Sequence, residues 1–94
     1  MAKLLDTILV VDVESTCWDG PPPAGQISEI IEIGVCTLDV PSLRRVEKRS
    51  LLVKPVRSAV SEFCTRLTTL TAEQLNGAGS LAAMVSSCVP SLLN

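Results

Sequence analysis

Two carboxylates at the end of an apolar segment are the residues best suited to chemistry. Asp12 and Glu14 lie near the end of residues 7–16, TILVVDVEST. We expect a β-strand here, in which residues i and i+2 point to the same face, about 6.5 Å apart along the strand. Two acids on one face repel each other and are costly to desolvate, and a cation between them would remove both penalties. Carboxylate oxygens without a nearby thiolate or imidazole suit Mg²⁺ or Mn²⁺.

The D-x-E spacing alone leaves two other interpretations open. The acids could end a strand in solvent, although a buried apolar strand seldom ends in paired acids without a reason. A phosphate site of the D-x-D-x-T type, with the first Asp as nucleophile, is disfavoured because the second acid is Glu14. No downstream lysine–acid set is evident either.

Composition restricts the chain to at most one small domain. It has 94 residues, of which 47% are apolar, and its aromatic residues are Trp18 and Phe63, so we expect an aliphatic core. Four cysteines without a C-x-x-C pair disfavour a zinc ribbon. The sequence shows no secretory signal and no apolar stretch long enough to cross a membrane, which favours a cytoplasmic protein with reduced thiols.

Charge is distributed unevenly along the chain. Residues 41–66 carry a net charge of +5, and the remainder carries −7. A basic rim beside an acidic metal site could steer a phosphate backbone, or it could keep an exposed strand in solution. The basic residues are Arg44, Arg45, Lys48, Arg49, Lys54, Arg57 and Arg66.

The first half of the chain predicts three strands. They cover residues 7–14, 27–39 and 44–53, and the first is apolar enough to be buried on both faces. Three consecutive prolines lie in the loop 15–26, and a turn at 40–43 joins the second and third strands.

The second half predicts short capped helices. Ser61 can cap a helix that begins SEFCTRL, and Thr71 with Gln74 has the spacing of a capping box. Ser80 can cap a last helix that Pro90 ends. Its apolar face consists of Leu81, Met84, Val85 and Cys88.

Three blocks of the sequence carry a family resemblance, and they occur in the family's order: DVESTCW, SEIIEIGV and SEFCTRLTTLTAEQL. In these blocks the chain resembles the DEDD superfamily of 3′-5′ exonucleases, in its DnaQ-like, RNase T-like group. The branch that includes the histone-mRNA exonuclease is the most similar. The resemblance runs from about Ile8 to about Leu81. It implies a 3′-5′ exonuclease that hydrolyses the 3′ ends of single-stranded RNA or DNA with two Mg²⁺ or Mn²⁺ ions.

The resemblance also assigns residues. Asp12 and Glu14 match catalytic metal ligands, Ser15 and Thr16 match positions beside the terminal nucleotide, and Leu67 and Thr68 match the region packed against its base. The family often has Gly at the position of Thr69. We expect Glu29 and Glu32 to face solvent or a structural partner. Phe63 is expected to lie in the core rather than stack on a base. Trp18 is expected either to line the cleft or to cover the core.

The family pattern breaks in the second half of the site. The second and third motifs of the family supply two Asp and a His base, whereas this chain has no His and its last acid is Glu73. We therefore expect residues 1–94 to be the N-terminal part of a single exonuclease domain. The fold would be a truncated α/β, RNase H-like one: a three-stranded antiparallel meander plus one or two helices, without the C-terminal strands. Its first strand would expose a long apolar edge.

Three functions remain open from the sequence. They are an exonuclease by lineage that is inactive alone, a catalytically dead module that binds nucleic acid or protein, and a non-functional fragment.

Overall fold

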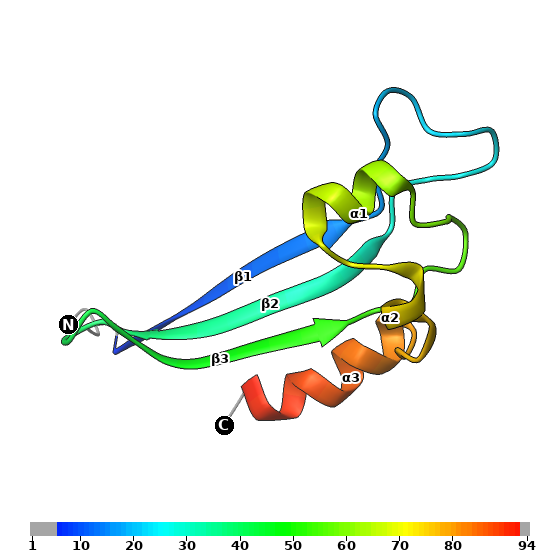
Figure 1. Ribbon diagram of the computed structural model, residues 1–94. Helices are drawn as coiled ribbons and strands as arrows, with labels where there is room; N and C mark the ends of the chain where they lie inside the picture. Colours follow the sequence, from blue (N-terminus) through cyan, green and yellow to red (C-terminus); the bar gives the residue numbers. More distant parts are fainter. Residues whose placement is uncertain (1–5, 93–94) are drawn as a thin grey trace.

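An antiparallel three-stranded sheet followed by three helices makes up the fold (Figure 1). The computed structural model describes residues 6–92, and for residues 88–92 the backbone alone. The elements are β1 (Thr7–Ser15), β2 (Ile30–Asp39), β3 (Arg44–Leu52), α1 (Glu62–Thr68), α2 (Ala72–Asn76) and α3 (Leu81–Leu92). The strand order is β1-β2-β3, as expected for a meander. The described residues form three helices, whereas one or two were expected for the truncated fold.

The strand bounds depart from the predicted ones where the ladder is irregular. A bulge at Glu14 and Ser15 lets β1 extend to Ser15. β2 begins at Ile30 rather than at residue 27, and β3 ends at Leu52 because Val53 forms a separate parallel bridge with Gly79. A second bulge interrupts the β2–β3 ladder at Thr37 and Leu38.

The caps of all three helices agree with the sequence. Ser61 and Ser80 accept hydrogen bonds from the N–H groups of Cys64 and Ala83, and Thr71 forms the full capping box with Gln74. The expected stop at Pro90 is wrong, since α3 continues to Leu92.

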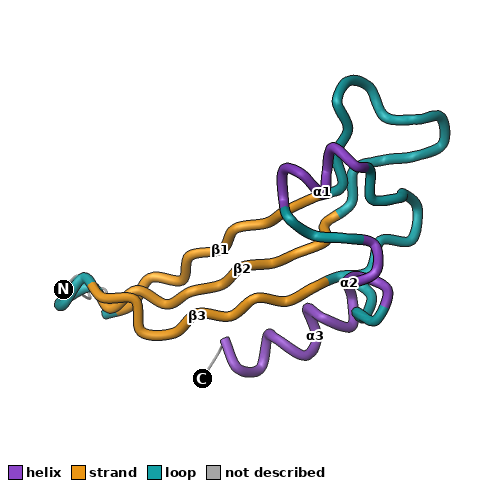
Figure 2. The backbone as a smooth tube through the Cα atoms, in the orientation of Figure 1, coloured by secondary structure: helices purple, strands orange, loops and turns teal. Residues whose placement is uncertain are grey.

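The core lies at one end of the sheet. Ile31, Cys64, Leu70 and Leu75 are buried together, and Cys17, Leu52 and Val60 pack against them. The chain measures 54 × 25 × 24 Å, and its radius of gyration of 16.1 Å exceeds the roughly 12 Å of a compact domain of this length. As Figure 2 shows, α1 and α2 lie at the end of the sheet where the core lies, and α3 starts there and points back toward the far ends of the strands.

β1 is an edge strand with both faces open among the described residues. Ile8, Leu9, Val10, Val11 and Val13 are 42–54% exposed. The expectation that this strand is buried on both faces is therefore wrong, and the expected apolar edge is confirmed. Within the part of the chain that the structure covers, no helix is long and apolar enough to cross a membrane.

Candidate functional site

Asp12 and Glu14 lie on one face of β1, as the i, i+2 spacing predicts. Across the ladder Asp12 faces Gly34 and Glu14 faces Glu32, so three carboxylates share this face near the end of the sheet. Directly opposed like charges destabilise an antiparallel pair. The Glu32 carboxylate accepts a hydrogen bond of 2.7 Å from the Ser50 hydroxyl, which is the structural partner expected for it.

The two carboxylates of β1 fit a magnesium ion as a partial set of ligands. Asp12 is exposed and Glu14 is half-buried, and Oδ1 of Asp12 accepts a 3.0 Å bond from the N–H of Val13. Among residues 6–87, whose side chains the structure describes, no group of three or more His, Cys, Asp or Glu side chains converges as a metal site. Magnesium is commonly held by one or two carboxylates together with substrate phosphates, so two hard oxygen ligands suit it. The metal role of Asp12 and Glu14 stays a prediction.

Thr16 is fully buried directly after β1. Its hydroxyl accepts a 2.8 Å bond from the N–H of Glu29 and lies 3.0 Å from the Ser58 hydroxyl, with which it shares a hydrogen bond. Its backbone N–H donates to the Glu29 carbonyl, and its carbonyl accepts from the Ser28 hydroxyl. In this structure Thr16 therefore joins the end of β1 to the start of β2 and to the connection after β3. Whether Thr16 and Ser15 also contact a nucleotide stays a prediction.

The Glu29 carboxylate holds the connection between β3 and α1. It accepts hydrogen bonds from the N–H groups of Val56 and Arg57, at 3.0–3.2 Å, and from the Ser58 hydroxyl at 2.7 Å. Desolvation acts to raise the pKa of Glu29, but the bonds from Ser58, Arg57 and Val56 outweigh it and leave the pKa below its ordinary value. Glu29 was expected to face either solvent or a structural partner, and the structure shows a structural partner. The sequence carries no signal for this partner, because two of the donors are backbone groups.

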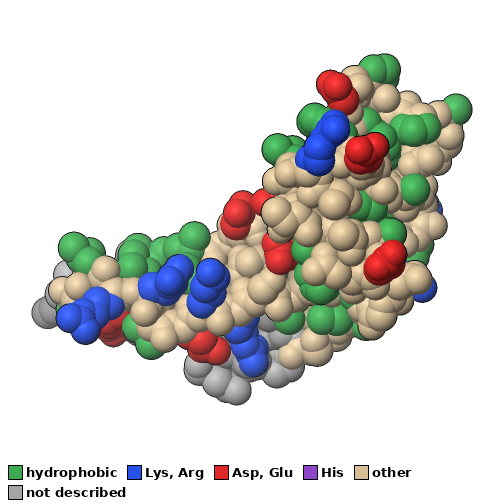
Figure 3. All heavy atoms as spheres, viewed as in Figure 1, with side chains coloured by type: hydrophobic (Ala, Val, Ile, Leu, Met, Phe, Trp, Pro, Cys, Tyr) green, Lys and Arg blue, Asp and Glu red, His purple; other side chains and the backbone are tan. Residues whose placement is uncertain are grey.

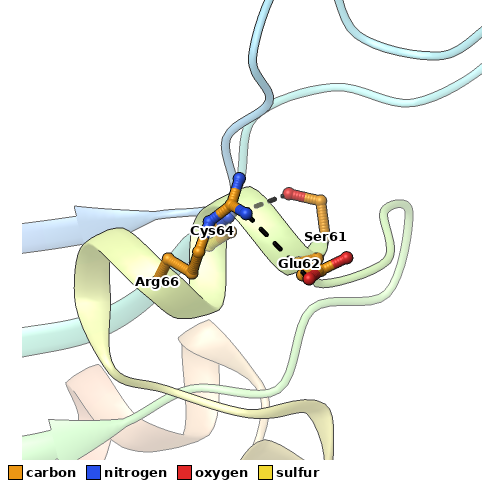
Figure 4. Close-up of polar contacts among 4 residues, drawn as sticks. All are labelled: Ser61, Glu62, Cys64 and Arg66. Carbon is orange, nitrogen blue, oxygen red and sulfur yellow. Dashed lines mark hydrogen bonds and ion pairs between the residues drawn. The ribbon is translucent and has the colours of Figure 1, made fainter.

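Ser61 connects α1 to the loop that leaves β1. Its hydroxyl accepts the 3.0 Å cap bond from the N–H of Cys64, which Figure 4 shows. The same hydroxyl donates a 2.6 Å bond to the Cys17 carbonyl. The Cys64 thiol donates to the Ser15 carbonyl at 3.6 Å. These contacts hold α1 beside the end of β1. The exposed pair Glu62–Arg66, also drawn in Figure 4, spans 4.0 Å and contributes little stability.

α1 ends with the residues matched to the terminal base. Leu67 is 66% exposed, which leaves its side chain accessible to a ligand. The Thr68 hydroxyl donates to the Cys64 carbonyl at 2.8 Å and accepts from the N–H of Leu70 at 3.2 Å. Thr69 has a φ of 67°, in the left-handed region that glycine adopts most readily. The structure therefore gives a backbone reason why Gly suits this position.

Cys17 has a raised pKa. Burial is the largest cause, followed by a hydrogen bond and an electrostatic interaction with Cys64 and by the charge of Glu14. A raised pKa favours the protonated form of the Cys17 thiol. Trp18 and Phe63 are both half-buried.

This chain is similar to known exonucleases. The RNase T exonuclease family matches residues 9–88. The 3′-5′ exoribonuclease 1 of Rattus norvegicus is 35% identical over 85 residues, which are 89% of this chain and 24% of that protein. The crystal structure of the nuclease domain of 3′hExo, a DEDDh family member bound to rAMP, superposes with a TM-score of 0.83 at 30% identity, over 93% of this chain and 44% of that one.

A second solved structure, of a 3′-exonuclease in 3′-end specific recognition of the histone mRNA stem-loop, has a TM-score of 0.83 at 29% identity. It covers 95% of this chain and 40% of the other. The chain therefore belongs to the RNase T-like exonuclease family, in its histone-mRNA-exonuclease-like branch, with an RNase H-like fold. It spans about a quarter of the length of the curated relatives that it matches over 85 residues.

Proposed function

We propose that this chain supplies the first metal-binding strand and part of the nucleotide site of a 3′-5′ exoribonuclease that acts on single-stranded 3′ ends. The observation that carries the proposal is the position of Asp12 and Glu14 on one face of β1, with α1 held beside the end of that strand by Ser61 and Cys64. The family match and the rAMP-bound neighbour support the substrate class.

Each residue has a separate task in this proposal. Asp12 and Glu14 hold Mg²⁺ or Mn²⁺, which when bound lowers the pKa of water and stabilises negative charge on phosphate oxygens. The exposed Leu67 offers an apolar surface to the terminal base. Ser15 borders the nucleotide at the bulge that ends β1, and the buried Thr16 beside it holds this end of the strand in place. Hydrolysis in the family also uses a His base and two further Asp residues, and these 94 residues contain no His.

Binding without cleavage is therefore the expected behaviour of the 94-residue chain. A Mn²⁺ titration followed by NMR should broaden the amide signals at Asp12–Ser15 first, and Asp12→Asn should weaken this effect at least tenfold. Asp39→Asn is the matched control, since Asp39 lies at the far end of β2 and caps the turn through Ser42. AMP should bind more tightly when Mg²⁺ is present. Equal broadening in the wild type and in Asp12→Asn would overturn the metal site, and Mg²⁺-dependent shortening of RNA by the pure chain would overturn the expected inactivity.

A further inference from the structure

A hollow lies on the face of the sheet that carries the predicted metal ligands. Its volume is about 350 Å³, at the lower end of the range for small-molecule sites. The residues that line it include Val10, Asp12, Gly34, Cys36, Arg45 and Lys48. All three strands contribute to it, so the hollow extends across the sheet from β1 to β3.

Small side chains on the central strand form its floor. Gly34 faces Asp12 on one side and Ser50 on the other, and Cys36 faces Val10 and Lys48. A Cβ added at Gly34 would meet the Asp12 carbonyl oxygen at 3.7 Å, an ordinary contact. Gly34 therefore keeps the hollow open because it has no side chain. Its backbone conformation does not itself require glycine.

The two ends of the hollow have opposite charge. Asp12 and Glu32 lie at the end nearest the core. Lys48 is aligned with Cys36 and Arg45 with Leu38, so the two cations lie on the same face as Asp12. Measured along β2, Lys48 lies two residues, about 7 Å, beyond Asp12, and Arg45 lies two residues beyond Lys48. Figure 3 shows Lys and Arg side chains gathered over the strands.

We propose that this hollow binds the RNA backbone on the 5′ side of the terminal nucleotide, with Lys48 and Arg45 contacting its phosphates. The inference rests on the proposed function, because Asp12 places the terminal phosphodiester at the acidic end. A polyanion that begins at a metal ion and continues over the two cations matches the order of charges along the face. An acidic peptide would match the cations but would meet Asp12 and Glu32 without compensation.

Two binding measurements test this inference. Fluorescence anisotropy measures the affinity for labelled octauridylate in the presence of Mg²⁺, and calorimetry measures the affinity for AMP. The double variant Lys48→Gln/Arg45→Gln should bind the octamer about fivefold more weakly, as expected for two solvent-exposed charge pairs. The slope of log K against log [salt] should fall by about 1.4. Its affinity for AMP should match the wild type, because AMP has no phosphate beyond the terminal site.

Two further variants sharpen the result. Arg57→Gln/Arg66→Gln removes the same charge at positions away from the hollow and should leave octamer binding near the wild-type value. Gly34→Val fills the floor and should weaken octamer binding, with folding checked by circular dichroism. Equal losses in the two double variants, or no loss in Lys48→Gln/Arg45→Gln, would overturn the inference. Failure of the proposed function would give a different result. AMP would then bind the wild type and Asp12→Asn equally well, or would not bind the wild type at all.

Discussion

At the scale of single residues, the buried Thr16 and the half-buried Glu29 make structural hydrogen bonds that the motif itself does not reveal. Thr16 and Glu29 belong to blocks that match exonucleases, and in this structure both fasten loops to the sheet. A carboxylate that accepts bonds from two backbone N–H groups and a hydroxyl is stabilised in its charged form. The loop at residues 56–58 therefore depends on the ionisation of one side chain.

Glu29→Gln should lower the free energy of unfolding by about 1 kcal/mol at pH 7, a modest value because Glu29 is partly exposed. The pKa of Glu29 is lower in the folded chain than its ordinary value of 4.5. Its stabilising contribution is thus complete above pH 4.5 and is lost as the pH falls through the folded-state pKa. The difference between the wild type and Glu29→Gln in urea denaturation should shrink over this acidic range, and a difference that does not change with pH would contradict the assignment.

At the scale of elements, the helices are short and depend on their ends. α1 has seven residues, with Ser61 capping its start and Thr69 in a left-handed conformation at its end. A β-branched residue in this conformation is strained, because its Cβ lies close to the carbonyl oxygen that follows. The end of α1 therefore offers a position where a single substitution should add stability.

Thr69→Gly should raise the free energy of unfolding by about 1 kcal/mol, because glycine adopts a positive φ without this strain. Thr65→Gly is the matched control within the helix and should lower the same quantity by about 1 kcal/mol. Urea denaturation at neutral pH measures both. A loss of stability in Thr69→Gly would show that the Thr side chain contributes more than its backbone strain costs.

At the scale of the whole molecule, the core supports one end of a long sheet. The buried cluster gathers near Ile31, Cys64 and Leu75, whereas β1 is exposed on both faces and β3 is exposed from Arg44 to Ser50. Apolar side chains on an open edge strand favour association with other strands. Stability should therefore decrease along the strands with distance from the helices.

Hydrogen exchange should show this gradient. Amides near Ile31 and Ile33 in β2 should exchange at least tenfold more slowly than those near Thr37 and Leu38, because the latter lie far from the core and beside a bulge. Mass spectrometry of peptides or NMR can resolve the two groups, which belong to the same strand. Uniform protection along β2 would mean that the sheet unfolds as one unit with the core.

The sequence by itself determined the local features of this protein. The three strands, the caps at Ser61, Thr71 and Ser80, and the shared face of Asp12 and Glu14 depend on residues a few positions apart, and the structure agrees with each of them. The family followed from the order of three short blocks, which the comparisons confirm.

Tertiary structure decided what depends on register and on backbone groups. The partners of Glu29 are N–H groups at residues 56 and 57, which no side-chain pattern reveals. The hollow exists because Gly34 is aligned with Asp12 and Ser50, and the same register places Lys48 on the face that carries Asp12 and Glu14. A shift of one residue in either ladder would turn these side chains to the other face, so only the folded sheet could place them.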